Sequence, residues 1–173
     1  MHALEFWKAV IVDRSNLLER FFELLRAHDV PFCLIGGQAL NAYVEPVVSL
    51  DLDVVIASDR LAEVESFVQG HFTVAHFPHS LNLSGSDSEL RIQIQLDPRY
   101  AAFLNRATVR DVLGLHVPVA AIEDILRGKI WAVQDETRRG SKRQKDLADI
   151  ARVIERHQPL RSMVPDKVLA RLV

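Results

Sequence analysis

Two aspartates one residue apart, Asp51 and Asp53, are the side chains in this sequence that best suit metal chemistry. The residues around them, 50–57, are otherwise apolar and indicate a buried β-strand. Successive side chains on a strand point to opposite faces, so both carboxylates would share one face. Proteins commonly hold Mg²⁺ through one or two carboxylates, with substrate phosphates and water as the other ligands. The spacing therefore predicts a metal site, with a solvated strand end as the alternative.

The chain contains one pair of adjacent glycines, Gly36 and Gly37, between an apolar run at 32–35 and a predicted short helix at 38–44. Glycine lets the backbone approach a ligand closely, and the free N–H groups at the start of a helix bind phosphate. The order strand, Gly-Gly, helix therefore predicts a phosphate-binding turn. A turn with only a structural role is the alternative.

The strands that must position these groups are predicted at residues 32–35 and 50–57, in three short segments between 71 and 96, and at 115–119. The last of the three short segments alternates regularly. Its apolar face consists of Leu90, Ile92, Ile94 and Leu96, and its polar face consists of Arg91, Gln93, Gln95 and Asp97. The polar face is either exposed to solvent or part of a site.

Helices are predicted before, between and after the strands, at residues 16–28, 58–69, 100–105, 121–135 and 142–157, with a short piece after Pro165. Residues 4–12 suit a helix, but three consecutive β-branched residues at 10–12 leave a strand open. The loop predicted between the two long helices contains a dense basic cluster: Arg138, Arg139, Lys142, Arg143 and Lys145. This cluster is either solvated or in contact with phosphates.

This order of elements indicates an α/β (α+β) fold, a mixed sheet flanked by helices with a C-terminal helical subdomain. We expect a single domain over residues 1–173, with a core at about 1–120 and a helical part at about 121–173.

The composition excludes several classes of protein. A formal net charge of −2 argues against a protein that coats nucleic acid non-specifically. Cys33 is the only cysteine, which excludes an internal disulfide, and its apolar surroundings indicate a small buried residue. No apolar run approaches the ~20 residues of a membrane span, and no signal peptide is recognisable. We expect a cytoplasmic protein without a membrane partner.

Two blocks of sequence resemble a known family. The segment GGQALNAYVEPVVSLDLDVVI resembles the signature of the nucleotidyltransferase superfamily (polymerase-β-like fold), a Gly-Gly or Gly-Ser turn followed by a strand with Asp-x-Asp. The second block resembles small bacterial members related to the abortive-infection nucleotidyltransferase toxins, where a helix with an internal lysine precedes a basic loop and a Lys-Asp-x-x-Asp helix. It reads HVPVAAIEDILRGKIWA, then RRGSKRQKDLADIARVIE. The resemblance spans residues 31–155.

The resemblance implies a role for each matching residue. Gly36 and Gly37 would contact the triphosphate of an NTP through their backbone, and Asp51 and Asp53 would bind catalytic Mg²⁺. Three further side chains would contact phosphates or neutralise their charge: Ser49, Lys129 and Lys145. The alternatives are a snorkelling role for Lys129 and a surface ion pair for Lys145.

The sequence departs from the family pattern at two positions. The family usually places an arginine three residues before the first aspartate, where this chain has Val48. The family also has a third catalytic carboxylate on a later strand, read as Arg-hydrophobic-Asp, where this chain has Gln93. A carboxamide cannot accept a proton at neutral pH and is a poorer metal ligand. Asp97 shares that face, but its Cα would lie roughly 13 Å further along a straight strand.

The resemblance therefore implies a Mg²⁺-dependent nucleotidyltransferase that transfers NMP from an NTP, with ATP the expected donor, to a hydroxyl of a protein, RNA or small molecule. The alternative is a catalytically degenerate member, suggested by Gln93, that binds a nucleotide or a partner. A toxin–antitoxin pair with a small helical partner protein is a third possibility.

Overall fold

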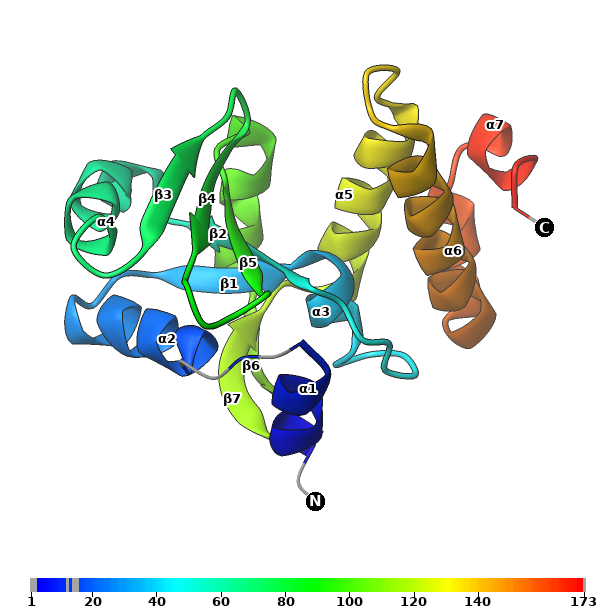
Figure 1. The fold of residues 1–173 in the computed structure, drawn as a ribbon. Coiled ribbons are helices and arrows are strands. Elements are labelled where there is room, and N and C mark those ends of the chain that lie inside the picture. Colours follow the sequence, from blue (N-terminus) through cyan, green and yellow to red (C-terminus); the bar gives the residue numbers. More distant parts are fainter. Residues whose placement is uncertain (1–2, 12, 14–15, 173) are drawn as a thin grey trace.

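The computed structural model describes residues 3–11, 13 and 16–172, and its centre is a seven-stranded mixed sheet. The strand order is β3-β4-β5-β2-β1-β7-β6 (Figure 1). The strands are β1 (Phe32–Ile35), β2 (Asp51–Ile56), β3 (Thr73–His76), β4 (Ser80–Ser84), β5 (Arg91–Gln95), β6 (Thr108–Val112) and β7 (Leu115–Val119). This sheet, with helices on it, confirms the predicted α/β (α+β) fold class.

The strands at the centre of the sheet are the most apolar. All four side chains of β1 are buried, as expected of a strand covered on both faces. The neighbouring β2 runs antiparallel to β1 and parallel to β5, whereas β1 runs parallel to β7. Ile35 at the end of β1 therefore pairs with Asp53 of β2, so the turn that follows β1 begins beside a carboxylate.

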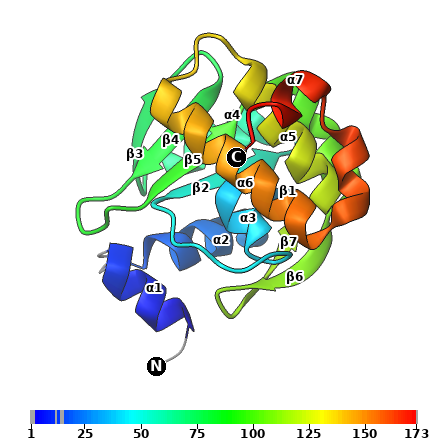
Figure 2. The ribbon, with the colours of Figure 1, turned by 90° about the vertical axis from the view of Figure 1, so that its right-hand side faces the viewer.

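Helices cover the sheet, and those that matter for the site lie at the end of β1. The α-helices are α1 (Ala3–Ile11), α2 (Leu17–Ala27), α3 (Gly36–Leu40), α4 (Leu61–Val68), α5 (Ile122–Gln134), α6 (Gly140–Arg156) and α7 (Asp166–Leu169), and the 3₁₀ helices are η1 (Ser58–Arg60), η2 (Pro98–Arg106) and η3 (Gln158–Met163). On one side of the molecule, α5, α6 and α3 pack together, and α2 and α4 lie on the other (Figures 1 and 2).

The structure corrects the predicted elements at several points. Residues 3–11 form a helix, which decides between the helix and the strand left open for 4–12, and residue 12 lies outside the described residues. The edge strand β6 was not predicted, because most of its side chains are exposed and carry no apolar alternation. The helix predicted at 142–157 is confirmed as α6 and begins two residues earlier, at Gly140, so three members of the basic cluster, Lys142, Arg143 and Lys145, lie on this helix and only Arg138 and Arg139 precede it.

No helix in the described part of the chain is long and apolar enough to cross a membrane. Cys33 is buried in the core, as predicted, and Trp7 is buried there as well. Burial raises the pKa of the Cys33 thiol to about 12, so this side chain behaves as a small apolar group.

Candidate active site

The turn after β1 packs directly against one of the two strand aspartates. Gly36 has a φ of +73°, a left-handed conformation that side chains rarely adopt. A Cβ atom at this position would lie 2.3 Å from Oδ2 of Asp53. Only glycine therefore allows the first turn of α3 to approach the carboxylate this closely. A Cβ at the next residue, Gly37, would lie 4.0 Å from Oδ2 of Asp149.

Strand β2 presents both aspartates on one face, as predicted from the alternation. Asp51 and Asp53 are partly accessible, and Leu52 between them is buried in the core. The parallel neighbour β5 places Arg91 beside Asp51 and Gln93 beside Asp53. Nε of Arg91 lies 2.9 Å from Oδ1 of Asp51, so this pair is an ion pair across two strands.

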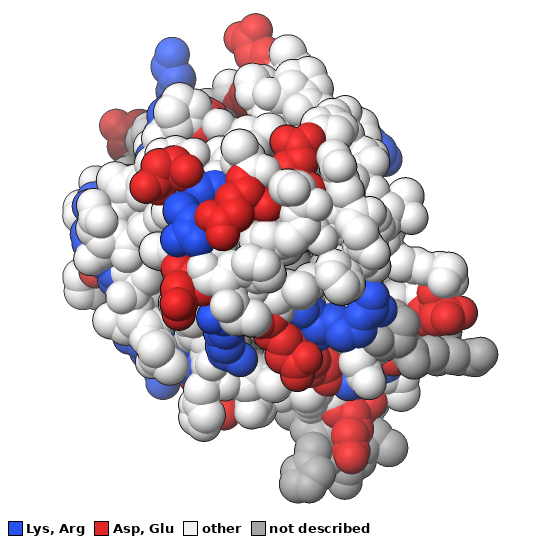
Figure 3. Space-filling model, turned by 90° about the vertical axis from the view of Figure 1, so that its left-hand side faces the viewer, with Lys and Arg blue, Asp and Glu red and all other residues white. Residues whose placement is uncertain are grey.

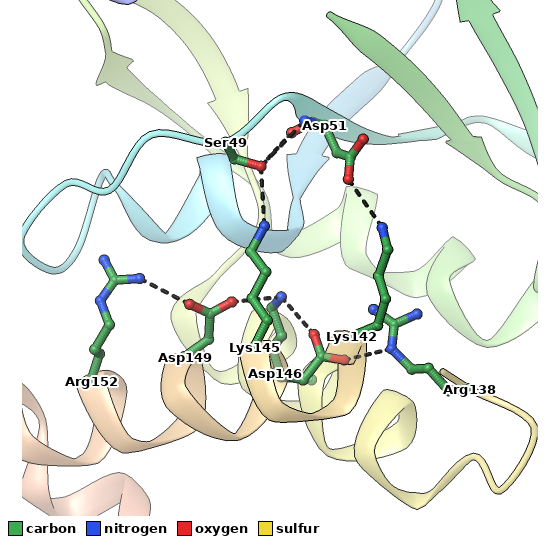
Figure 4. A network of polar contacts seen from close by, with 9 residues as sticks. Ser49, Asp51, Arg138, Lys142, Lys145, Asp146, Asp149 and Arg152 are labelled. Carbon is green, nitrogen blue, oxygen red and sulfur yellow. Dashed lines mark hydrogen bonds and ion pairs between the residues drawn. The ribbon is translucent and has the colours of Figure 1, made fainter. Parts of the chain in front are cut away.

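Helix α6 brings two lysines to the same strand from far along the chain. Nζ of Lys142 lies 3.2 Å from Oδ2 of Asp51, and Nζ of Lys145 lies 3.3 Å from Oγ of Ser49 (Figure 4). The Ser49 hydroxyl in turn lies 3.2 Å from the backbone N–H of Asp51, which donates to it. Cations near a helix N-terminus are disfavoured by the helix dipole, so helix stability does not explain these lysines.

Lys142 was not singled out from the sequence as a site residue, although the basic cluster that contains it was. The signal was present, but the sequence does not say which member of the cluster reaches Asp51. In the structure Lys142 lies in the first turn of α6 and its side chain points at Asp51 of β2 (Figure 4).

Lys129 is buried between α5 and α6 and holds two carboxylates. Its Nζ lies 3.0 Å from Oδ1 of Asp146 and 2.8 Å from Oδ2 of Asp149. The snorkelling interpretation of this lysine is therefore wrong, because its ammonium group is inside the protein. Arg138 and Arg152 each contact one of the same two carboxylates from the outer side of the cluster (Figure 4).

Asp146 and Asp149 are site residues that the sequence interpretation did not assign. They are the two aspartates of the Lys-Asp-x-x-Asp helix, so the motif itself was the signal. Their spacing of three places both on one face of α6. They fix Lys129 at the wall of the site and join α5 to α6 there.

Burial and charge shift the pKa values of the groups at this site. Burial raises the pKa of Asp53; the Lys129 ammonium opposes this rise and the Asp51 carboxylate adds to it. Burial alone would depress the pKa of Lys129, but Asp149 and Asp146 outweigh it and raise the pKa overall. Ionising Asp53 in the folded protein therefore costs free energy, and a bound cation would reduce this cost.

A cavity of about 110 Å³ lies beside Asp53, Lys129 and Asp146. It is lined by Gly36, Asp53, Gln93, Tyr100, Lys129 and Arg138, among others. Burial raises the pKa of the Tyr100 hydroxyl to about 12, so Tyr100 stays neutral there. The ring of Tyr100 approaches α5 at Gly128, where a Cβ would lie 3.0 Å from Cε1 of the ring. The cavity thus lies between the sheet and α5.

The two departures from the family pattern have clear positions in the structure. Gln93 lies next to Asp53 in register and lines the cavity. Asp97 instead caps η2 by accepting a hydrogen bond from the Arg99 backbone N–H and pairs with the Arg99 guanidinium at 2.8 Å. Asp97 is thus paired with Arg99 and does not replace the missing third carboxylate. Val48 is exposed in the loop before β2.

The donor atoms around β2 are suited to Mg²⁺. Oδ1 of Asp51 is buried and accepts no well-aligned hydrogen bond, although Nε of Arg91 is near. Burial also raises the pKa of the Asp53 carboxyl. Two carboxylates leave coordination positions for substrate oxygens and water, which is the usual arrangement for this ion. Among the described residues, no three His, Cys, Asp or Glu side chains are grouped to hold a metal without such substrate oxygens.

Away from this site, acidic and basic side chains are mixed. On the face that carries α2 and α4, Lys and Arg alternate with Asp and Glu, and no extended patch of one sign is visible (Figure 3). The pair of Arg60 with Glu63 belongs to this region. The face in Figure 3 therefore offers no broad electrostatic surface for nucleic acid.

Comparison with protein families gives one match over nearly the whole chain. A family model described as "Nucleotidyl transferase AbiEii toxin, Type IV TA system" matches residues 17–172. A comparison with curated proteins found no match.

Solved structures of similar fold include two antibiotic-modifying enzymes. The crystal structure of ANT(2'')-Ia with adenylyl-2''-tobramycin is 13% identical, with a TM-score of 0.61 over 91% of this chain and 97% of that chain. The lincomycin-bound lincosamide antibiotic adenylyltransferase LnuA is 12% identical, with a TM-score of 0.55 over 79% of this chain and 96% of that chain. JHP933 from Helicobacter pylori is 21% identical, with a TM-score of 0.50 over 84% of this chain and 69% of that chain. At these identities the likeness concerns the fold.

Proposed function

This chain belongs to the AbiEii family of nucleotidyltransferase toxins, and we propose that it transfers NMP from a Mg²⁺-bound NTP to an acceptor hydroxyl. One observation carries the proposal. Asp51 and Asp53 share a face of β2 between the Gly36 turn, which touches Asp53, and Lys142, which contacts Asp51. A glycine turn suited to phosphate, two carboxylates suited to a metal ion and an ammonium group thus lie together at the ends of the central strands β1 and β2.

We assign the triphosphate to the space between α3 and the start of α6. The backbone of Gly36 and Gly37 begins α3 and can approach a phosphate without obstruction by side chains. From the opposite side, Lys145 and Ser49 present an ammonium group and a hydroxyl 3.3 Å apart, and Lys142 adds a second ammonium group. Amide N–H groups and ammonium groups are the donors that stabilise phosphate oxygens.

Lys129 has a different role in this proposal from the one that the resemblance implied. Its charge is already balanced by Asp146 and Asp149, so its first role is to position the wall of the cavity. Its raised pKa keeps it charged at neutral pH, and its field lowers the cost of ionising Asp53.

Asp51 and Asp53 would hold the Mg²⁺ ion. When bound there, the ion would neutralise charge on the phosphates and stabilise the oxygens that attack and leave. In the reaction, the acceptor oxygen forms a bond to the α-phosphorus, the bond from that phosphorus to the bridging oxygen breaks, and pyrophosphate leaves.

Gln93 means that no side chain beside Asp53 on β5 removes the proton from the acceptor, so that proton passes to water. Phosphoryl-type transfer through a loose transition state depends mainly on positioning and charge, and a general base typically adds ~10²–10⁴-fold. Transfer without this base is therefore slower but feasible. The alternative is a protein that binds nucleotide without turnover, and Gln93 is the observation that favours it.

The donor and the acceptor complete the proposed reaction. ATP is the donor we propose first, since the two neighbouring enzymes named above are adenylyltransferases or carry an adenylylated product. The acceptor is a hydroxyl of a protein, RNA or small molecule. The family description, a toxin of a type IV toxin–antitoxin system, also leads us to propose a small antitoxin protein as partner.

The test is transfer of label from α-³²P-NTPs with Mg²⁺ to components of a cell lysate. We expect the native chain to label an acceptor and the double variant Asp51→Asn, Asp53→Asn to label none. Equal labelling by the double variant would exclude this site. Nucleotide binding without pyrophosphate release in any lysate would instead support the binding-only alternative.

A further inference from the structure

Next to the catalytic cavity lies a wider cleft of about 550 Å³ that the proposed chemistry does not use. It is bordered by β4 and β5 on the sheet side, by η2, and by the C-terminal half of α5. The cleft and the 110 Å³ cavity share five lining residues, so the two hollows adjoin: Gln93, Gln95, Tyr100, Ala132 and Arg138. A volume of this size suits a small organic group, whereas the cavity alone is too small for one.

Arg99 forms a fixed planar surface in this cleft. Its guanidinium lies over the Trp131 ring, 4.6 Å from the centroid, and Trp131 stacks on Phe103 with ring centroids 5.8 Å apart. Asp97 holds the same guanidinium through Nε and a terminal nitrogen, at 3.0 and 2.8 Å. The Arg99 side chain is nevertheless 55% exposed. A guanidinium held in this way presents a flat, preorganised surface to the cleft.

The charges in the cleft are balanced within the protein. Two of the five N–H groups of Arg99, on Nε and one terminal nitrogen, already point to Asp97, whose carboxylate balances the charge of the guanidinium. Arg138, also at the cleft, is paired with Asp146 at 2.5 Å. The remaining carboxylate, Asp135, accepts hydrogen bonds from Thr137. The cleft is therefore poorly suited to a phosphate or to a polycation, and better suited to an uncharged planar group.

Three glutamine amides provide hydrogen-bonding groups at the edges of this surface. Gln93, Gln95 and Gln134 all line the cleft. Oε1 of Gln95 accepts a hydrogen bond from the Asp97 backbone N–H, which leaves its NH₂ group for a ligand. Amides of this kind read the donor and acceptor pattern of nucleobases, and guanidinium planes stack on bases.

We propose that the cleft is a nucleobase-binding site in which the base stacks on Arg99 and its edge bonds to the glutamine amides. The inference rests on the proposed function, because the adjoining cavity is where the nucleotide would react. The base belongs either to the donor NTP or to the acceptor, and the chemistry of recognition is the same for both.

The experiment compares the affinity of the full chain for Mg-ATP, Mg-tripolyphosphate and adenosine by calorimetry. If the donor base binds here, ATP binds about 10-fold or more tightly than tripolyphosphate, the range expected of one stacked base. The variant Arg99→Lys keeps a positive charge beside Asp97 but has no plane, and we expect it to remove that advantage. Tripolyphosphate affinity should not change.

A second variant tests the cleft without changing Arg99, so that the result does not depend on whether Arg99→Lys folds. The Gln134 side chain is exposed and makes no hydrogen bond to another described residue, so Gln134→Ala should fold normally and weaken ATP binding several-fold. Gln144→Ala, an exposed change on α6 away from the cleft, serves as the control.

The remaining outcomes decide the source of the base and the validity of the site. Binding of adenosine in the presence of saturating ATP, with an affinity that Arg99→Lys lowers, would place the acceptor base in the cleft. Equal affinities for ATP and tripolyphosphate, with no adenosine binding, would overturn the inference and leave the transfer proposal intact. The transfer proposal fails separately, through labelling that does not depend on Asp51 and Asp53.

Discussion

Gln93 lies in register beside Asp53 on the neighbouring parallel strand, with both side chains at the wall of the same cavity. This is the position from which a third carboxylate would share a metal with Asp53 or take a proton from the acceptor. If the proposed function holds, replacing Gln93 therefore measures how much a third carboxylate adds to the rate of transfer.

Gln93→Asp should therefore raise the rate of pyrophosphate release about 100-fold or more, since it restores a group that accepts a proton. Without Mg²⁺ the variant should melt at a lower temperature than the native chain, because a third carboxylate adds repulsion, and Mg²⁺ should restore the loss. Asn82→Asp, which pairs with Gln93 from β4, adds the same charge one strand further from Asp53 and is the control. An unchanged rate in Gln93→Asp would contradict this role.

Gly36→Ala should inactivate the protein and destabilise it by about 2–3 kcal/mol. The added Cβ would meet Oδ2 of Asp53 at 2.3 Å, and the φ of +73° is unfavourable for alanine. Gly140→Ala is the matched control, because its Cβ meets no atom within 4 Å and alanine favours the start of α6. Urea unfolding and label transfer measure both effects, and equal stability of the two variants would refute the close packing.

Asp53→Asn should inactivate the protein yet increase its stability at neutral pH by about 1 kcal/mol. Burial raises the pKa of Asp53 above its ordinary value of 3.8, so ionising it costs folding free energy. This cost is complete above the folded-state pKa, decreases as the pH falls through it, and vanishes below 3.8. The stability difference between variant and native chain should therefore shrink on acidification.

The control for that experiment is Asp51→Asn. Asp51 is paired with Arg91 and Lys142, so its neutralisation should bring no gain in stability. Urea unfolding at several pH values, without Mg²⁺, gives both curves. A lower stability of Asp53→Asn at neutral pH would show that the carboxylate is not desolvated as described.

Lys129→Met should destabilise the fold by about 3 kcal/mol or more, because it leaves Asp146 and Asp149 with uncompensated charge inside the protein. Lys167→Met, at an exposed lysine of α7, should have little effect. Adding Asp149→Asn to Lys129→Met should recover part of the loss, since one buried charge is removed. Absence of recovery would argue against the ion pair as the cause.

Lys142→Met should raise the KM for Mg-NTP about 10-fold, the effect of losing one charged hydrogen bond to phosphate. Its contact with Asp51 is partly exposed, with 37% of the lysine side chain accessible, so we expect little change in stability. Gln144→Met on the same helix is the control. The same KM in Lys142→Met and the control would remove Lys142 from the triphosphate site.

The sequence determined the parts of the site that depend on local periodicity. The two-residue repeat of a strand places Asp51 and Asp53 on one face, and the same repeat placed Gln93 on the polar face of β5. Gly36 was predictable because a strand that turns sharply into a helix needs a residue without a side chain. The predicted fold class follows from the same local patterns, and the structure confirms it.

Tertiary structure alone decided which charged groups meet. Lys142 and Asp51 are 91 residues apart, and Lys145 and Ser49 are 96 apart, so no local pattern links them. Their contact depends on how α6 packs across the end of β2, whereas the sequence predicted only that both lysines belong to a basic cluster at the start of a helix over 142–157. Whether Lys129 faces water or two aspartates depends in the same way on the packing of α5 against α6. Side-chain periodicity fixes the face of an element, but only packing decides which other element that face contacts.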